Sequence, residues 1–322
     1  MHNVNKTIVN EFLLVGFSSF QKFYNIIFYV VLLSYILCML GNIAIIALIR
    51  THPALHIPMY FFITIFAFLE IMFASVTVPK LLSILANCDY SISVIGCFTQ
   101  MYVLHALGET ECFLLTLMSL DRYLAINNPL RYSTIMSNAF CYVLGSLSWI
   151  AGFIFPLVPT AFTILLEYCG PNEINKFFCD FAPLQNLACS DPMLSNYATT
   201  SVTITSVICP FIIIVVLYIH IIRTVLKIDS TAGKKKAFST CSSHLIVSSL
   251  FFGTGIIVYI KPKGSQYDKF LALMYTIVTP MLNPFIYTLR NTEVKKAFRK
   301  SIRPFHKLLL LSTFKSLSSK ST

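Results

Sequence analysis

Three glutamates and a histidine lie inside two long apolar stretches of the sequence, where they could hold a proton or a cation. Glu70 and Glu111 each lie near the middle of a stretch, and two carboxylates inside a helix bundle suggest a shared proton or a bound cation. Glu109 is two residues before Glu111, about 200° around a helix, so it must face elsewhere. His105 lies one turn before Glu109 on the same face. This pair could line a cavity, or it could be a mutually satisfied structural pair.

The tripeptide Asp121-Arg122-Tyr123 follows at the end of one of these stretches. Adjacent Asp and Arg at a membrane boundary can pair with each other or release the arginine to a partner, which suits a two-state switch. The alternative is that Arg122 only extends its charged end toward water. The tripeptide alone is weak support for either interpretation.

Seven apolar stretches must position these residues, and each is long enough for a helix that crosses a bilayer core of about 30 Å. Of the 322 residues, 56% are hydrophobic and 11% are charged, too few charges to cover a soluble protein. The continuous runs favour helices over barrel strands. We therefore predict an all-α membrane protein, a seven-transmembrane helix bundle with spans at Phe23–Ile49, Ile57–Val78, Gly96–Leu120, Ala139–Phe162, Tyr197–Ile222, Ala237–Ile260 and Phe270–Leu289.

The distribution of basic residues predicts the orientation of the bundle. With the amino terminus outside, 17 of the 24 lysines and arginines fall on the cytoplasmic side. We therefore expect an extracellular arm at residues 1–22, the bundle at 23–290 and a cytoplasmic segment at 291–322. Asn5-Lys6-Thr7 is a sequon on the predicted outer side, which makes Asn5 a candidate glycosylation site.

Cysteines on the predicted outer side could form disulfide bridges. Cys97 lies at the outer end of the third span, and Cys169, Cys179 and Cys189 lie in the long loop after the fourth. Four cysteines allow three pairings, and the exterior is oxidising. A bridge from Cys97 would fix the loop over the bundle, the other two cysteines would close a hairpin, and Cys88 would remain free. A metal site is the alternative, but the loop has no histidine and no Cys-x-x-Cys pair.

Prolines interrupt the later spans, at Pro156, Pro159, Pro210, Pro280 and Pro284. Each removes a backbone donor, frees a carbonyl group one turn earlier and bends its helix. Asn283, beside Pro284, could satisfy one freed carbonyl. The later spans are therefore expected to be bent helices that can move.

Five blocks of sequence, in order, resemble the odorant receptors, a branch of the rhodopsin-like G-protein-coupled receptors. They are Gly41-Asn42, Pro58–Phe62, Met118–Ile126 with Pro129–Tyr132, Lys236–Leu245 and Pro280–Asn291. The Lys-Ala-Phe-Ser-Thr-Cys-x-Ser-His run in the fourth block is peculiar to odorant receptors. The chain departs from the family pattern at Ser119-Leu120, where Ala-Tyr is usual, at Asn127, where a cysteine is usual, and at Phe252, where a tyrosine is common.

The resemblance implies an odorant-sensing receptor of the plasma membrane that is not an enzyme. It would activate a heterotrimeric G protein, the stimulatory olfactory type that raises cyclic AMP. The basic segment Arg223–Lys236 and a short amphipathic eighth helix, Thr292–Arg303, would meet the G protein and anionic membrane lipid. No nucleic-acid partner is expected.

The resemblance also assigns roles to individual residues. It pairs Cys97 with Cys179 and Cys169 with Cys189. An inner switch would be formed by Asp121, Arg122 and Tyr123, with support from Tyr218 and Tyr287. An interior site for a sodium ion or a shared proton would be formed by Glu70, Glu111 and Asn283; no other cofactor is expected.

A ligand between the outer halves of the third, fifth, sixth and seventh spans would meet mostly apolar or hydroxyl-bearing side chains. The inward candidates are Leu104, His105, Gly108, Glu109, Thr203, Ser206, Phe252, Gly255, Tyr259 and Thr276. We therefore expect a small, largely hydrophobic ligand with one or two polar groups. Amine receptors of the wider family have an aspartate where this chain has Leu104, which argues against an amine anchored in that way.

Other function classes fit less well. A transporter is expected to have related halves with broken helices in matching positions, and the seven spans lack this symmetry. An intramembrane enzyme needs a catalytic group, and neither His-Glu-x-x-His nor a phosphate-binding Gly-Lys-Ser/Thr run is present. A rhodopsin-like receptor for a lipid or a peptide is the nearest alternative, although the short outer segments argue against a large peptide.

Overall fold

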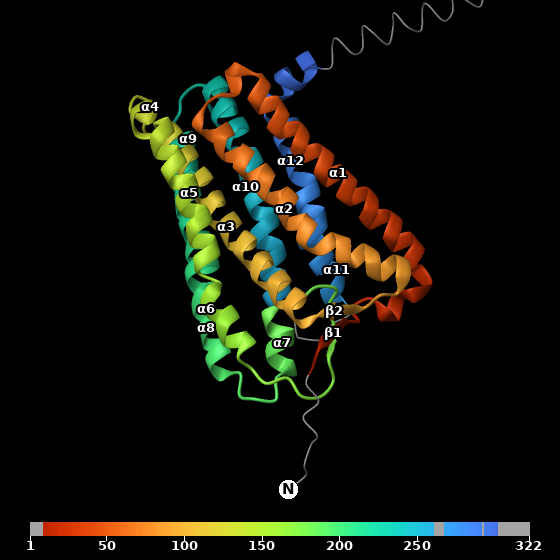
Figure 1. Cartoon of the computed structure of the whole chain (residues 1–322). Helices are drawn as coiled ribbons and strands as arrows, with labels where there is room; N and C mark the ends of the chain where they lie inside the picture. Colours follow the sequence, from red (N-terminus) through yellow and green to blue (C-terminus); the bar gives the residue numbers. More distant parts are fainter. Residues whose placement is uncertain (1–8, 261–266, 292, 302–322) are drawn as a thin grey trace, which may run out of the picture.

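The structure is a computed structural model that describes residues 9–260, 267–291 and 293–301. Its helices form one elongated bundle, with the amino-terminal segment at one end and the described carboxyl-terminal residues at the other (Figure 1). The residues 293–301 are helical, within the predicted amphipathic helix. Three predictions lie outside the described residues: the sequon at Asn5, the side chain of Tyr259, and the two ends of the amphipathic helix at Thr292 and 302–303.

The first three predicted spans are the single helices α1 (Tyr24–Thr51), α2 (Pro58–Asn87) and α3 (Val94–Asn127). The fourth is α5 (Asn138–Ile154) with α6 (Leu157–Ile164). The fifth is α8 (Met193–Thr203), the π-helical turn η3 (Ile204–Ile208) and α9 (Cys209–Leu226). The sixth is α10 (Thr231–Ile260), and the seventh is α11 (Tyr267–Leu273), the π-helical turn η4 (Met274–Val278) and α12 (Thr279–Arg290). Short helices η1 (Ser18–Phe23), η2 (Pro53–Leu55), α4 (Tyr132–Ile135) and α7 (Phe181–Leu187) lie between or before them.

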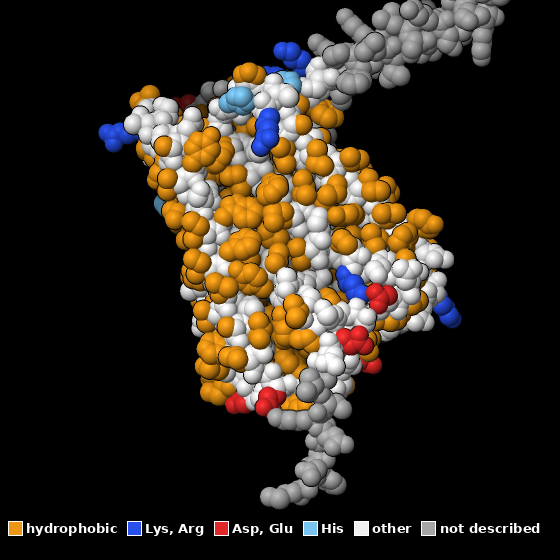
Figure 2. Space-filling model, in the orientation of Figure 1, with side chains coloured by type: hydrophobic (Ala, Val, Ile, Leu, Met, Phe, Trp, Pro, Cys, Tyr) orange, Lys and Arg blue, Asp and Glu red, His pale blue; other side chains and the backbone are white. Residues whose placement is uncertain are grey.

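The surface of the bundle suits a membrane. Within the described residues, six of the spans are long and apolar enough to cross a bilayer, all except α10. That helix is as long as α2, at 30 residues, but its first half contains three lysines and several hydroxyl groups. Hydrophobic side chains cover the middle of the visible face, and charged side chains gather toward its ends (Figure 2).

Three of the five predicted prolines lie at helix breaks, whereas Pro159 lies inside α6 and Pro284 inside α12. Pro156 lies between α5 and α6 as the N-cap of α6. Pro210 and Pro280 lie in the first turns of α9 and α12, and a π-helical turn precedes each of them. In these turns a backbone N–H bonds to the carbonyl five residues earlier and not four, as the Thr279 N–H does to the Met274 carbonyl. The wider turn relieves the clash between the proline ring and the preceding backbone.

One expectation about a proline and one predicted span boundary were wrong. The carbonyl of Pro280, which Pro284 leaves without its helical donor, accepts a hydrogen bond from Asn42 Nδ2 of α1 at 3.3 Å, so Asn283 is not its partner. The predicted end of the second span at Val78 was too early, because α2 continues through Pro79 to Asn87. It stops at Cys88, whose φ of 53° is the left-handed conformation that commonly ends helices.

A small sheet at the extracellular end is the main feature that the all-α prediction did not contain. Strand β1 (Glu11–Leu14) lies between β2 (Ser91–Ser93) and β3 (Glu173–Ile174). It pairs antiparallel with β2, Phe12 opposite Ile92, and parallel with β3, Leu13 opposite Glu173. The side chains of Phe12 and Leu14 are buried. The sheet therefore fixes the amino-terminal arm to the first and second outer loops.

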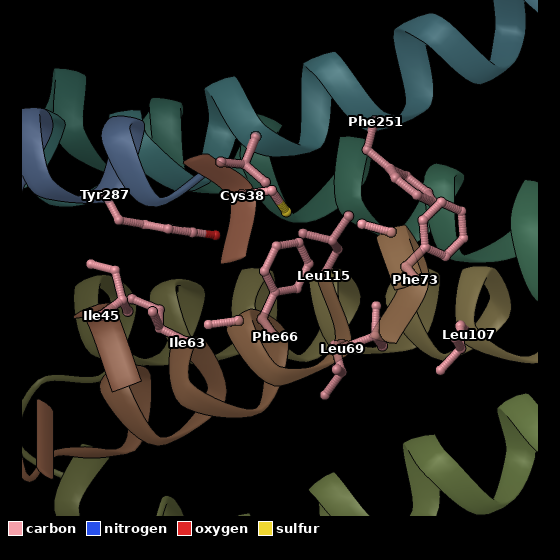
Figure 3. Close-up of a cluster of buried hydrophobic side chains, with 14 of the residues drawn as sticks. Cys38, Ile45, Ile63, Phe66, Leu69, Phe73, Leu107, Leu115, Phe251 and Tyr287 are labelled. Carbon is pink, nitrogen blue, oxygen red and sulfur yellow. The ribbon is translucent and has the colours of Figure 1, made fainter. Parts of the chain in front are cut away.

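The core runs along the middle of the bundle and centres on α3, which contacts α2, α5, α9 and α10. Figure 3 shows part of it, where Phe66 and Leu69 of α2 lie close to Leu115 of α3. Large aromatic and aliphatic side chains are buried here, Phe62, Phe66 and Phe73 among them. The polar residues described next are embedded in this apolar packing.

Candidate functional site

The second outer loop is fastened onto the outer end of α3. Disulfides join Cys97 to Cys179 and Cys169 to Cys189, the pairs that the resemblance implies. Gln100 of α3 reinforces the first bridge, because its Oε1 accepts the Cys179 N–H at 3.0 Å and its Nε2 donates to the Val76 carbonyl at 2.9 Å. These contacts hold the loop helix α7 against the mouth of the bundle.

His105 is paired with this loop and not with Glu109. Its Nε2 lies 2.9 Å from Asp180 Oδ1, and its ring packs on Phe181, with ring centroids 4.3 Å apart. Lys176 forms an ion pair with the other carboxylate oxygen of Asp180. Burial by itself would raise the pKa of Asp180, but the charge of Lys176 and the hydrogen bond with His105 outweigh it and hold that pKa well below its usual range.

Asp180→Asn is expected to lower the stability of the receptor at neutral pH by about 1–3 kcal/mol, because it removes a charged hydrogen-bond acceptor. Folding lowers the pKa of Asp180. The advantage of the wild type is therefore fully present above the unfolded value of about 3.9 and is lost as the pH falls below it toward the folded pKa.

Thermal unfolding of the two purified receptors at neutral pH and below the unfolded pKa measures this difference. Glu173→Gln is the control, since it removes an exposed carboxylate from the same loop. A gap between wild type and Asp180→Asn that has the same size at both pH values would contradict the charged role of Asp180.

Glu109 is the most polar of the predicted ligand-binding residues, and it is buried in the bundle. Its side chain is 5% exposed, and its Oε2 has no hydrogen-bond partner among the described residues. The carboxylate also contacts the Ser206 side chain of η3. The structure thus brings Glu109 and Ser206 together, although they are almost a hundred residues apart.

The other predicted ligand residues are spread over the same region. Leu104 and Phe252 are buried, and Gly108 lies beside Tyr275, since a Cβ on it would be 3.3 Å from the Tyr275 hydroxyl. Thr203 and Thr276 direct their hydroxyls to carbonyls in their own helices. Gly255 borders open space, because no atom of the described residues lies within 4 Å of the position that a Cβ on it would take.

Sequence reasoning missed two residues of this region, Asp180 and Tyr275. The Tyr275 ring contacts Phe73 of α2 and Phe251 of α10, with centroids 5.5 Å away in both cases. Asp180 follows Cys179 directly, so the predicted bridge from Cys97 could have indicated that it lies near α3.

A hydrophobic groove of about 530 Å³ opens elsewhere, on the outer surface between α5, α6 and α8. Its lining includes Phe155, Val158, Tyr197 and Val202, and it contains none of the predicted ligand residues. Many of these side chains are exposed, as expected for a surface that faces lipid. We do not assign the ligand to this groove.

The interior acidic cluster lies deeper. Glu70 is fully buried, accepts a hydrogen bond from Asn283 Nδ2, and is close enough to Glu111 for the two carboxyl groups to interact electrostatically. Within the described residues, Glu70 Oε2, Asn283 Oδ1 and the Tyr287 hydroxyl have no hydrogen-bond partner. Orphaned buried oxygens are expensive, so this cluster has the chemistry to hold a proton or a hard cation.

The cytoplasmic end contains the Asp121-Arg122 pair in a closed arrangement. Arg122 Nε donates to Asp121 Oδ2 at 2.8 Å, and the hydroxyl of Tyr132 donates to Asp121 Oδ1 at 2.6 Å. Arg122 is 5% exposed, so it does not simply extend toward water. The neighbouring Tyr123 ring lies against His220 of α9.

Tyr218 has a partner that the sequence did not suggest. Its hydroxyl lies 2.6 Å from His244 Nδ1 of α10, and the two rings stack with centroids 5.8 Å apart. His244 belongs to the Lys236–Leu245 block, to which we had given no structural role. This contact joins α9 to α10 near the paired arginine.

Comparison with known proteins shows extensive similarity. The family model described as "Olfactory receptor" matches residues 31–303. Olfactory receptor 6E1 of Mus musculus is 45% identical over 307 residues, which cover 94% of this chain and 98% of the relative. Olfactory receptor 10C1 of Homo sapiens is 44% identical over 304 residues, which cover 94% and 97%.

Proposed function

The chain belongs to the olfactory receptor family, and on that premise we propose that it binds a small, largely hydrophobic odorant in the outer half of the bundle and acts through the stimulatory olfactory G protein, which raises cyclic AMP. Members of this family are odorant-sensing G-protein-coupled receptors with seven transmembrane helices in the plasma membrane. The chain is therefore a receptor and not an enzyme.

The observation that carries the mechanism is the closed, buried cluster of Asp121, Arg122 and Tyr132. Arg122 lies 13 residues beyond Glu109 on α3, about 20 Å along the helix axis. A ligand acts at that distance only if it binds the open bundle more tightly than the closed one. We propose that the ligand contacts that differ between the open and the closed bundle lie on α10, near Phe252 and the open space beside Gly255.

Glu109 supplies the polar contact for the ligand in this proposal. In this proposal Glu109 is neutral, and it donates a hydrogen bond from its unpartnered Oε2 to the oxygen of an alcohol, an aldehyde or an ester in an otherwise apolar site. Leu104, Phe252 and Thr276 supply shape and apolar contact around it.

The interior cluster fits a resident sodium ion or a shared proton. Glu70, Glu111 and Asn283 present oxygen atoms, the donors that hard cations prefer, and two of these oxygens lack partners among the described residues. The positive charge of the ion or proton would offset the negative charge of Glu70 and Glu111. On the cytoplasmic side, the basic residues of Arg223–Lys236 and the helix at 293–301 are the proposed contacts with the G protein and with anionic lipid.

Cyclic AMP is the readout that tests this function. Cells that express the chain with the stimulatory olfactory G protein are exposed to a panel of small volatiles, beside cells with Arg122→Ala at the same surface level. We expect at least one volatile to raise cyclic AMP and Arg122→Ala to abolish the response. Silence across the panel despite surface expression would refute the ligand class or the G protein type, and lipids and other G proteins would be tested next.

A further inference from the structure

We propose that Asn127 and Thr224 hold the receptor in its resting state, through a hydrogen bond that ties the cytoplasmic end of α3 to α9; this rests on the proposed G-protein coupling. Thr224 donates its hydroxyl to Asn127 Oδ1. We call this hydrogen bond the α3–α9 link. It occurs where the chain departs from its family, which usually has a cysteine at the position of Asn127.

The geometry of the link is fixed from both sides. Asn127 is the last residue of α3, and its Nδ2 donates to the Tyr123 carbonyl at 3.1 Å, which orients the amide so that Oδ1 faces α9. Both side chains are half-buried. In the described residues, no other side-chain hydrogen bond joins α3 to α9; the Tyr123 ring contacts His220, and Arg122 is close enough to Tyr218 to interact with it electrostatically. Apolar contacts tolerate sliding of the helices, whereas a hydrogen bond requires one register.

The link lies among the groups that must separate when the receptor opens. Arg122 is five residues before Asn127 and is paired with Asp121. Tyr218, six residues before Thr224, connects α9 to His244 of α10. In this proposal opening breaks the link, so the link stabilises the closed arrangement alone, and removing it shifts the equilibrium toward the open state without any ligand. Asn127 and Thr224 are thus positioning residues that set the basal activity.

Ligand-independent cyclic AMP at matched surface level is the first measurement. Asn127→Ala and Thr224→Val should each raise it about two- to tenfold, the effect of one neutral hydrogen bond. Thr224→Ser keeps the hydroxyl and should behave as wild type. The double variant should exceed neither single variant, because both remove the same interaction. Thr205→Val is the matched control, since the Thr205 hydroxyl bonds only to carbonyls of its own helix among the described residues.

A second readout does not depend on any G protein. Cys241 of α10 is a free thiol, 6% exposed and close enough to Arg122 to feel its charge. The rate at which a water-soluble maleimide labels Cys241 in purified full-length receptor should rise in Asn127→Ala and Thr224→Val. Labelling of Cys112, buried in α3, should stay unchanged and exclude general loosening.

The outcomes separate the two proposals. Faster labelling of Cys241 with unchanged cyclic AMP would support the α3–α9 link and refute the assumed G protein. Unchanged or slower labelling in both single variants would overturn the link, as would additive effects in the double variant.

Discussion

The Gly152→Val receptor is expected to fail to reach the cell surface. A Cβ atom on Gly152 of α5 would lie 2.0 Å from the Thr110 hydroxyl oxygen, 2.8 Å from the Thr110 backbone nitrogen and 2.9 Å from the Ala106 carbonyl oxygen. Two of these atoms belong to the backbone of α3, so no side-chain rotation can make room. Overpacking a core costs about 1–3 kcal/mol or more. Here α3 and α5, which pack directly against each other, must move apart. We expect at least about 3 kcal/mol, a large part of a typical stability of about 5–15 kcal/mol.

Flow cytometry against an extracellular tag measures the surface level of this variant. Gly253→Ala serves as the comparison, because a Cβ at Gly253 would meet no atom of the described residues within 4 Å. That variant should reach the surface as well as the wild type. If Gly152→Val also did so, the close packing of α5 on α3 at this glycine would be incorrect.

The double substitution Cys97→Ala with Cys179→Ala is expected to have the second large effect, loss of most surface receptor and of any ligand response. The bridge spans 82 residues, whereas Cys169–Cys189 spans 20. In the chain-entropy account, the longer loop is worth about 4–5 kcal/mol and the shorter about 3 kcal/mol. The longer bridge also positions the loop that carries Asp180 over the ligand region.

Surface level and thermal unfolding should therefore fall further for this double variant than for Cys169→Ala with Cys189→Ala. Cys88→Ala should change neither quantity, because Cys88 is exposed and free. Equal losses in the two double variants would mean that neither loop length nor the contact of the second outer loop with α3 matters to stability.

Much of the fold was predictable because a membrane imposes one rule, that apolar runs of sufficient length become helices. Pro156, Pro210 and Pro280 marked helix breaks because a proline has no backbone N–H to donate. Pro79 shows the limit of this reasoning. A proline can sit inside a continuing helix, and only the packing around it decides whether the helix stops.

The partners of the site residues were harder to predict. Helical periodicity placed His105 and Glu109 on one face, but it cannot say what faces them from elsewhere. The actual partner of His105, Asp180, is 75 residues away in a loop whose course depends on a disulfide. Asn42 and Pro280 are 238 residues apart, and Tyr218 and His244 meet across two helices. Such contacts depend on tertiary packing, which no local pattern encodes.

The outer sheet has a consequence for how the receptor is made. Strand β1 is synthesised early, but one of its neighbours, the segment around β3, follows 161 residues later, as the bond between Asn172 and Glu11 shows. At about 5–20 residues per second, ribosomes take roughly 8–30 seconds to cover that distance. Throughout this interval the edge of β1 and the side chains of Phe12 and Leu14 lack their final cover. An uncovered edge of this kind invites pairing with other chains. In the nascent receptor, the edge of β1 that faces β3 therefore stays unpaired until the second outer loop has been translated.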